Sequence, residues 1–151
     1  MFMLKKFVSS LLCVLMLVGC GTSTSAGKSA AAEAESIVSQ LNLGDKVEKV
    51  EDRIIKGLFF FDEGTLKDSA VYIANDKSAD VVAVFQSDDT AAVKEKVDSY
   101  LATAKEQMQN YYPDEVFKID NAIVTESGNQ VVLIVTSDIE NARKVAESVL
   151  K

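Results

Sequence analysis

Two uninterrupted apolar runs constrain the fold of this chain more than any other feature. Residues Val81–Gln86 are nearly all β-branched or aromatic, and Val131–Val135 contains only apolar side chains. A strand with one face in water alternates apolar and polar residues, whereas a strand covered on both faces does not. The two runs therefore predict two central strands.

Each run has a candidate partner strand just before it. Ser69–Ala74 is rich in residues that favour strands, and polar residues 75–79 separate it from the first run. Ala122–Thr125 is separated from the second run by the turn residues Ser127–Asn129. This spacing of strand, turn and strand predicts two β-hairpins.

Three helices are predicted around these hairpins. The first follows the N-cap candidate Ser29 and repeats apolar residues along one face. The longest covers roughly 90–111 and follows Asp88 and Asp89, whose carboxylates suit the positive end of a helix dipole. The last begins at Ser137–Glu140, which matches a capping box.

The order of these elements predicts an α+β domain of the form α-ββ-α-ββ-α, with an antiparallel sheet built from two hairpins and helices packed on one face. Asp45–Lys56 is charged and poorly periodic, so we expect an irregular or short helical connection there. The apolar residues along one face of the long helix predict that Leu101 is buried together with the strand residues Val84 and Leu133. Lys105 lies on the opposite side of that helix and should face solvent.

The first twenty residues are typical of an export signal. Lys5 and Lys6 precede the apolar run Phe7–Val18, which contains no acidic residue. A transmembrane helix is the alternative, but the run is shorter than the roughly 20 residues that span a membrane. A simple secretory peptide would not require a cysteine directly after Leu-Val-Gly.

Leu17–Cys20 resembles the lipobox of bacterial lipoproteins, in which the cysteine sulfur receives a diacylglyceryl group and becomes the first mature residue. The resemblance implies a signal peptide over 1–19 and a lipid on Cys20. Residues 20–28 are small and polar and predict a flexible tether. The globular domain is expected over 29–151.

The mature chain lacks the side chains on which several common chemistries depend. The full sequence has no histidine and two cysteines, Cys13 in the segment expected to be removed and Cys20 at the start of the mature chain. This excludes Ser-His-Asp and Cys-His nucleophiles, and zinc sites built on imidazole or thiolate. Loss of Lys5 and Lys6 leaves 14 basic and 23 acidic side chains, and a net charge of −9 disfavours nucleic acid as a partner. We expect no cofactor and no metal.

Three short segments resemble a family of small lipoproteins of unknown function from Gram-positive bacteria. They are Ala79–Phe85, Tyr112–Glu115 and Asn121–Val124. In that family a second acidic residue commonly follows the position of Asp80, where this chain has a valine. The resemblance implies the location and the fold of the domain, but no activity, cofactor or catalytic residue.

Two groups of acidic residues are candidate sites. Asp76–Asp80 carries oxygen side chains at alternate positions, as a calcium loop does, but lacks the glycine that allows its sharp bend. A polar hairpin turn is the better interpretation. The adjacent pairs Asp62–Glu63 and Asp88–Asp89 do not by themselves give the carboxyl separation that glycoside hydrolysis needs, so turn and cap roles explain them.

Aromatic residues suggest a binding surface. Neighbours on a strand point to opposite faces, so Phe60 faces solvent if Phe59 and Phe61 lie in the core, or the reverse. An exposed Phe60 beside Tyr111 or Tyr112 would suit a peptide or a glycan. Coverage of the phenylalanines by the first helix is the simpler alternative.

The expected function is that of a non-catalytic module, tethered to the extracytoplasmic face of the cell membrane, which binds an envelope protein or cell-wall component. The alternative is a cell-envelope hydrolase that uses carboxylates only. A contiguous exposed aromatic patch favours the binding module. A cleft with two carboxylates about 5 to 9 Å apart favours the hydrolase.

Overall fold

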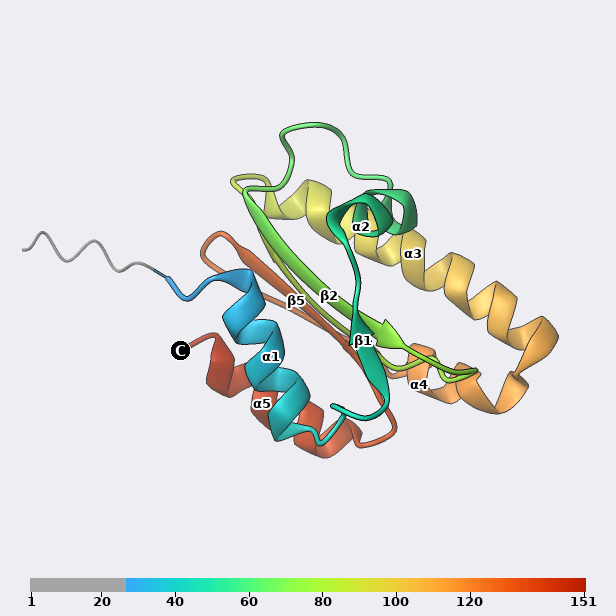
Figure 1. The fold of residues 1–151 in the computed structure, drawn as a ribbon. Helices are drawn as coiled ribbons and strands as arrows, with labels where there is room; N and C mark the ends of the chain where they lie inside the picture. Colours follow the sequence, from blue (N-terminus) through green and yellow to red (C-terminus); the bar gives the residue numbers. More distant parts are fainter. Residues whose placement is uncertain (1–26) are drawn as a thin grey trace, which may run out of the picture.

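A five-stranded antiparallel sheet forms the centre of the computed structural model, which describes residues 27–151 (Figure 1). The strand order is β1-β2-β3-β5-β4. The bounds are β1 Val47–Lys49, β2 Asp68–Ala74, β3 Val81–Gln86, β4 Ile123–Ser127 and β5 Gln130–Val135. Both predicted hairpins are confirmed, and they join through β3 and β5, where Ala83 lies opposite Leu133.

Within residues 27–151 five α-helices surround the sheet, so the α+β class is confirmed. They are α1 Ala30–Gln40, α2 Asp52–Phe59, α3 Thr90–Tyr111, α4 Val116–Asp120 and α5 Ile139–Val149, with a 3₁₀ turn, η1 Pro113–Glu115, before α4. Ser29 caps α1 by accepting a hydrogen bond from the Ala32 amide at 3.2 Å. Asp138, not the predicted Ser137, caps α5.

The sheet is covered on both faces, so the prediction that the helices pack on one face was wrong. One core contains Val82 and Val84 of β3 together with α1 and α5, and the other contains Phe85 of β3 together with α2, α3 and α4. Figure 1 shows α1 and α5 on one side of the sheet and α2 and α3 on the other. The physical reason lies in β3 and β5, because their apolar residues point alternately to both faces and each face needs cover.

The segment between α1 and β2 contains more regular structure than predicted. The short edge strand β1 pairs with β2, with Val47 opposite Ala74. The run Phe59–Phe61 does not form a strand. Helix α2 ends at Phe59, and the other two phenylalanines follow it. Phe60 ends the helix in the left-handed conformation, with φ of 53°.

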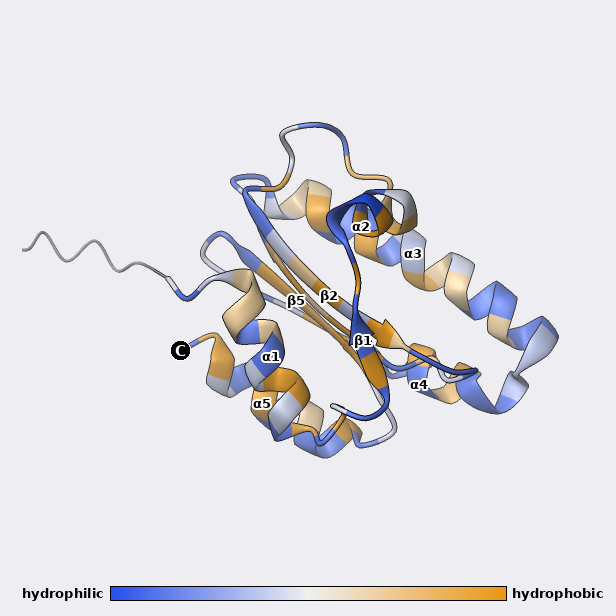
Figure 2. Cartoon of the chain, viewed as in Figure 1, coloured by the Kyte–Doolittle hydropathy of each residue, from blue (hydrophilic) through white to orange (hydrophobic). Residues whose placement is uncertain are grey.

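Helix α3 lies closely on the sheet only through its first half. Val93 and Val97 are fully buried, whereas Tyr100, Leu101 and Met108 are only partly buried against the same core. The predictions for Val84 and Leu133 are confirmed, but Leu101 is less buried than expected. Figure 2 shows apolar residues gathered along the strands and polar ones toward the far end of α3. Within residues 27–151, none of the helices has the length and apolar character to cross a membrane.

Candidate functional site

The three residues of the predicted binding surface are all exposed. Phe60 and Tyr111 are each 74% exposed, and Tyr112 is 36% exposed. Phe60 faces solvent because it follows the last turn of α2, and not because of strand alternation. Cys20, the predicted lipidation site, lies outside the residues that the structure describes.

The structure does not bring these three aromatic residues to one hollow. Phe60 borders a surface hollow whose other side is the middle of α3, including Lys96 and Thr103. Tyr111 and Tyr112 border a separate hollow of about 380 Å³ beside the β2–β3 turn. The predicted surface therefore divides into two parts.

A third exposed aromatic residue, Phe117, accompanies the two tyrosines. It is 58% exposed on α4, so Tyr111, Tyr112 and Phe117 all lie within the short segment 111–117, which we call the aromatic corner. Lys77 of the β2–β3 turn lies over the Tyr112 ring, with its Nζ 5.6 Å from the ring centroid. Sequence reasoning missed Phe117, although a five-residue helix cannot turn all of its apolar side chains to the core.

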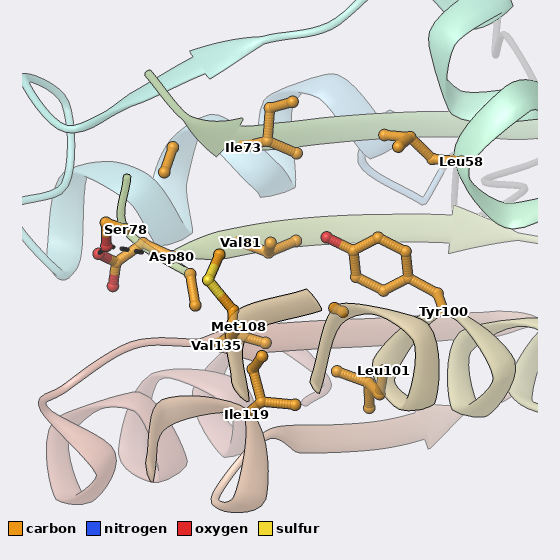
Figure 3. Close-up of a pocket in the computed structure, with 13 residues that line it drawn as sticks. Leu58, Ile73, Ser78, Asp80, Val81, Tyr100, Leu101, Met108, Ile119 and Val135 are labelled. Carbon is orange, nitrogen blue, oxygen red and sulfur yellow. Dashed lines mark hydrogen bonds between the residues drawn. The ribbon is translucent and has the colours of Figure 1, made fainter. Parts of the chain in front are cut away.

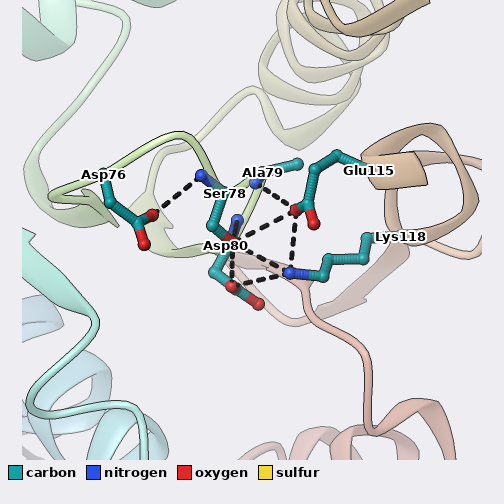
Figure 4. Close-up of polar contacts among 6 residues, drawn as sticks. All are labelled: Asp76, Ser78, Ala79, Asp80, Glu115 and Lys118. Atoms are coloured by element: carbon teal, nitrogen blue, oxygen red, sulfur yellow. Dashed lines mark hydrogen bonds and ion pairs between the residues drawn. The ribbon is translucent and has the colours of Figure 1, made fainter. Parts of the chain in front are cut away.

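Four polar side chains meet next to this corner, as Figure 4 shows. Lys118 of α4 is at the centre of the cluster, and its Nζ lies 3.0 Å from Asp80 Oδ2, 2.8 Å from Glu115 Oε2 and 2.8 Å from Ser78 Oγ. Glu115 also accepts a hydrogen bond from the Ala79 amide at 2.8 Å. The Ser78 hydroxyl has one proton to donate, and Asp80 is its nearer acceptor.

The charged side chains of the cluster are largely shielded from solvent. The side chains of Asp80 and Lys118 are 5% and 14% exposed. Burial alone would raise the pKa of Glu115, but hydrogen bonds from Lys118 and Ala79 and the charge of Lys118 outweigh it and lower that pKa. Burial likewise opposes the charge on Lys118, and the hydrogen bonds and charges of Glu115 and Asp80 outweigh it and raise its pKa.

This cluster connects the β2–β3 turn to α4, and its groups already have partners. Asp76 stays within the turn, where its Oδ1 accepts from the Ser78 amide at 2.8 Å. The interpretation of Asp76–Asp80 as a polar hairpin turn therefore agrees with the geometry. In the part of the chain that the structure describes, no group of three or more metal-ligating side chains is placed to hold a metal ion.

The carboxylates of the adjacent pair Asp88–Asp89 have local roles. Asp89 caps α3 by accepting from the Ala92 amide at 2.9 Å. Asp88 forms an exposed ion pair with Lys67, 2.5 Å between Asp88 Oδ1 and Lys67 Nζ. The contact of Asp89 matches the predicted cap role, whereas the ion pair of Asp88 was not predicted.

A cavity of about 150 Å³ lies between the second half of α3 and the sheet, as Figure 3 shows. Its walls are mainly apolar, with Leu58 of α2 at one side and Ile119 of α4 at another. Ser78 and Asp80 form its polar end, so the cavity adjoins the cluster around Lys118. Tyr100 of α3 lines it and turns its hydroxyl inward.

Comparison with known proteins gives a family but no function. Residues 39–136 match the family model described as a domain of unknown function, DUF4358, so the chain belongs to that family. The match runs from the end of α1 through β5 and includes the cavity and the aromatic corner. No curated protein and no solved structure matches the chain.

Proposed function

We propose that this chain is a membrane-anchored extracytoplasmic lipoprotein, and that its folded domain is a non-catalytic binding module of the cell envelope. The anchor rests on the sequence: Lys5 and Lys6, a short apolar run, and Leu17–Cys20 as the lipobox-like cleavage site. Acyl chains on Cys20 would hold the protein on the membrane, since each buried CH₂ contributes about 0.8 kcal/mol.

The aromatic corner is the observation that carries the binding role. Of the large apolar side chains that are exposed within residues 27–151, Tyr111, Tyr112 and Phe117 belong to this one segment, and only Ile54 and Phe60 lie elsewhere. Aromatic side chains supply much contact area, and they are enriched where proteins bind partners. An exposed set of this kind is therefore better suited to recognition than to packing.

The position of the corner agrees with a tethered module. Figure 1 places the start of the described chain and the turn between α3 and α4 at opposite ends of the domain. A chain held at the membrane through its N-terminus would present this far end to the envelope. We propose an envelope protein or a cell-wall polymer as the partner.

The carboxylate-dependent hydrolase remains the alternative, but it receives less support. The most buried carboxylate, Asp80, and its neighbour Glu115 are both paired with Lys118. Adjacent carboxyls in a general acid–base pair need separate environments that shift their pKa values apart. Here both carboxylates form an ion pair with the same lysine, so they share one environment. Release of soluble fragments from isolated cell walls by the purified chain would contradict the non-catalytic assignment.

The anchor is tested by metabolic labelling with a fatty acid in cells that express the wild type or Cys20→Ala. We expect label and membrane association in the wild type only. If the alanine variant is still labelled and stays in the membrane fraction, the lipid is attached to another residue.

The binding surface is tested by crosslinking and pull-down from intact cells. The double variant Tyr111→Ser and Phe117→Ser should lose the crosslinked partners. Phe60→Ser is the matched control, because Phe60 is as exposed as Tyr111 but lies outside the aromatic corner. Equal recovery of partners with the double variant and the wild type would remove the corner from the binding surface.

A further inference from the structure

The cavity between α3 and the sheet exists because small side chains face one another there. Ala74 and Ala79 come from the β2–β3 hairpin, and Ala104 comes from the second half of α3. None of the side chains in this half of α3 is fully buried, so the helix does not fill the space between itself and the sheet. A space of about 150 Å³ remains, which is partly open to solvent and has the volume of an engineered closed cavity that takes up benzene.

Tyr100 places a hydrogen-bonding group in this space. Its ring is fixed by Phe59, with ring centroids 4.4 Å apart. Its hydroxyl points into the cavity, and no hydrogen bond joins it to any of the residues that line the cavity, as Figure 3 shows. Burial raises the pKa of Tyr100 to about 12, so the hydroxyl keeps its proton near neutral pH and can donate it.

Packing alone does not account for this hydroxyl. Phenylalanine fills the neighbouring positions of the same aromatic group, at Phe59, Phe61 and Phe85, and it would fill position 100 without a polar atom. Within residues 27–151 no buried polar side-chain atom lacks a hydrogen-bond partner, so the Tyr100 hydroxyl, which has no partner in the protein, reaches solvent. A ligand that displaces water from this space must therefore accept the hydrogen bond that the hydroxyl otherwise donates to water.

The charges near the cavity restrict the ligand further. Asp80 at the polar end disfavours an anion. It already accepts hydrogen bonds from Lys118, 3.0 Å away, and from Ser78, and Glu115, which shares Lys118, does not line the cavity, so the lining presents no unpaired carboxylate to a cation. A neutral group fits these surroundings best.

We propose that this cavity is a ligand site that takes a neutral ring or branched chain about the size of benzene, carrying a carbonyl or other oxygen acceptor for the Tyr100 hydroxyl. The site is separate from the aromatic corner and does not depend on the lipid anchor. It adds a small-molecule specificity to the proposed binding module.

Cyclohexanone and methylenecyclohexane are suitable probes, because they have the same shape and differ in one group, an oxygen acceptor in place of a CH₂. Binding to the full chain in lipid nanodiscs is measured by saturation-transfer-difference NMR, with protein-free nanodiscs as the blank. Tyr100→Phe removes only the hydroxyl. Ala104→Leu fills the cavity from a partly buried position, and circular dichroism confirms that both variants are folded.

Three results are expected together. The wild type binds both probes, Tyr100→Phe weakens binding of cyclohexanone about fivefold without changing that of methylenecyclohexane, and Ala104→Leu weakens binding of both. Absence of binding above the blank would overturn the proposal. Equal cyclohexanone binding by Tyr100→Phe would remove the hydroxyl from the site, and unchanged binding by folded Ala104→Leu would place the probes elsewhere. None of these outcomes bears on anchoring or on the aromatic corner.

Discussion

Phe59 and Phe60 are chain neighbours for which the structure predicts opposite responses to substitution. Phe59 is 1% exposed and contacts the rings of Phe61, Phe85 and Tyr100, with centroids 4.4 to 5.6 Å apart. Truncating it to alanine removes most of a buried aromatic side chain and leaves a cavity. We expect Phe59→Ala to lower the free energy of unfolding by roughly 3–5 kcal/mol.

Phe60 tests how the helix ends. It is 74% exposed and has φ of 53°, a conformation that costs a non-glycine residue about 1 kcal/mol and costs glycine little. Phe60→Ala should change stability by less than about 0.5 kcal/mol. Phe60→Gly should stabilise the domain by up to about 1 kcal/mol, as glycine does after a helix.

Urea unfolding of the segment 27–151, followed by far-UV circular dichroism, measures all three variants. The glycine variant is the most informative, because glycine inside a strand would destabilise the fold by roughly 0.5–1 kcal/mol. A destabilising Phe60→Gly would refute the left-handed helix end. A harmless Phe59→Ala would refute the aromatic core that α2 and α3 share.

Three further predictions concern the core, pH and metals. Leu133→Ala should cost roughly 2–4 kcal/mol and Leu101→Ala less. Lys105→Ala should cost at most about 1 kcal/mol, because its 2.5 Å ion pair with Asp120 is partly exposed and screened by solvent; urea unfolding ranks the three. Ionised Glu115 has a pKa below its ordinary 4.5, so its stabilising contribution is present above pH 4.5 and is lost as pH falls through the folded pKa. The stability difference between wild type and Glu115→Gln should therefore shrink with acid, and a constant difference would contradict the pairing. The midpoint temperature of thermal unfolding should not change with chelator or reductant. A large shift of this temperature with EDTA would instead support a metal site at Asp76–Asp80.

The parts of the fold that follow from local pattern were predictable from the sequence. β3 and β5 are continuous apolar runs, and their burial on both faces was foreseen from the lack of alternation. That same observation implies cover on both faces of the sheet. Helices on one face alone would leave the other side of β3 and β5 exposed, and in the structure α2, α3 and α4 cover that side.

Strand β1 and the extent of helix α2, which runs on to Phe59, escaped prediction for physical reasons. β1 has three residues, too few to show an alternating pattern. α2 has eight residues, contains Gly57, and ends in aromatic residues that are also common in strands. Its position is fixed by contacts with α3 and the sheet and not by local propensity.

The candidate site depends on contacts that a linear pattern does not reveal. Asp80 and Lys118 are 38 residues apart and meet only because α4 folds back beside the β2–β3 turn. The spacing of Glu115 and Lys118, three residues apart, was a readable sign of an ion pair. The apolar face of α3 could be read from the sequence, but the cavity beneath Tyr100 depends on which alanines face it in three dimensions.

Site-specific photo-crosslinking in living cells tests the central claim, that the aromatic corner of a lipid-anchored domain binds the envelope partner. A photoreactive phenylalanine analogue is placed at Tyr111 or, as the control, at exposed Lys144 on α5. The account predicts a discrete crosslinked product from position 111 that is absent from position 144 and lost when Cys20 is replaced by alanine. No product at position 111, or the same product at both positions, would contradict it.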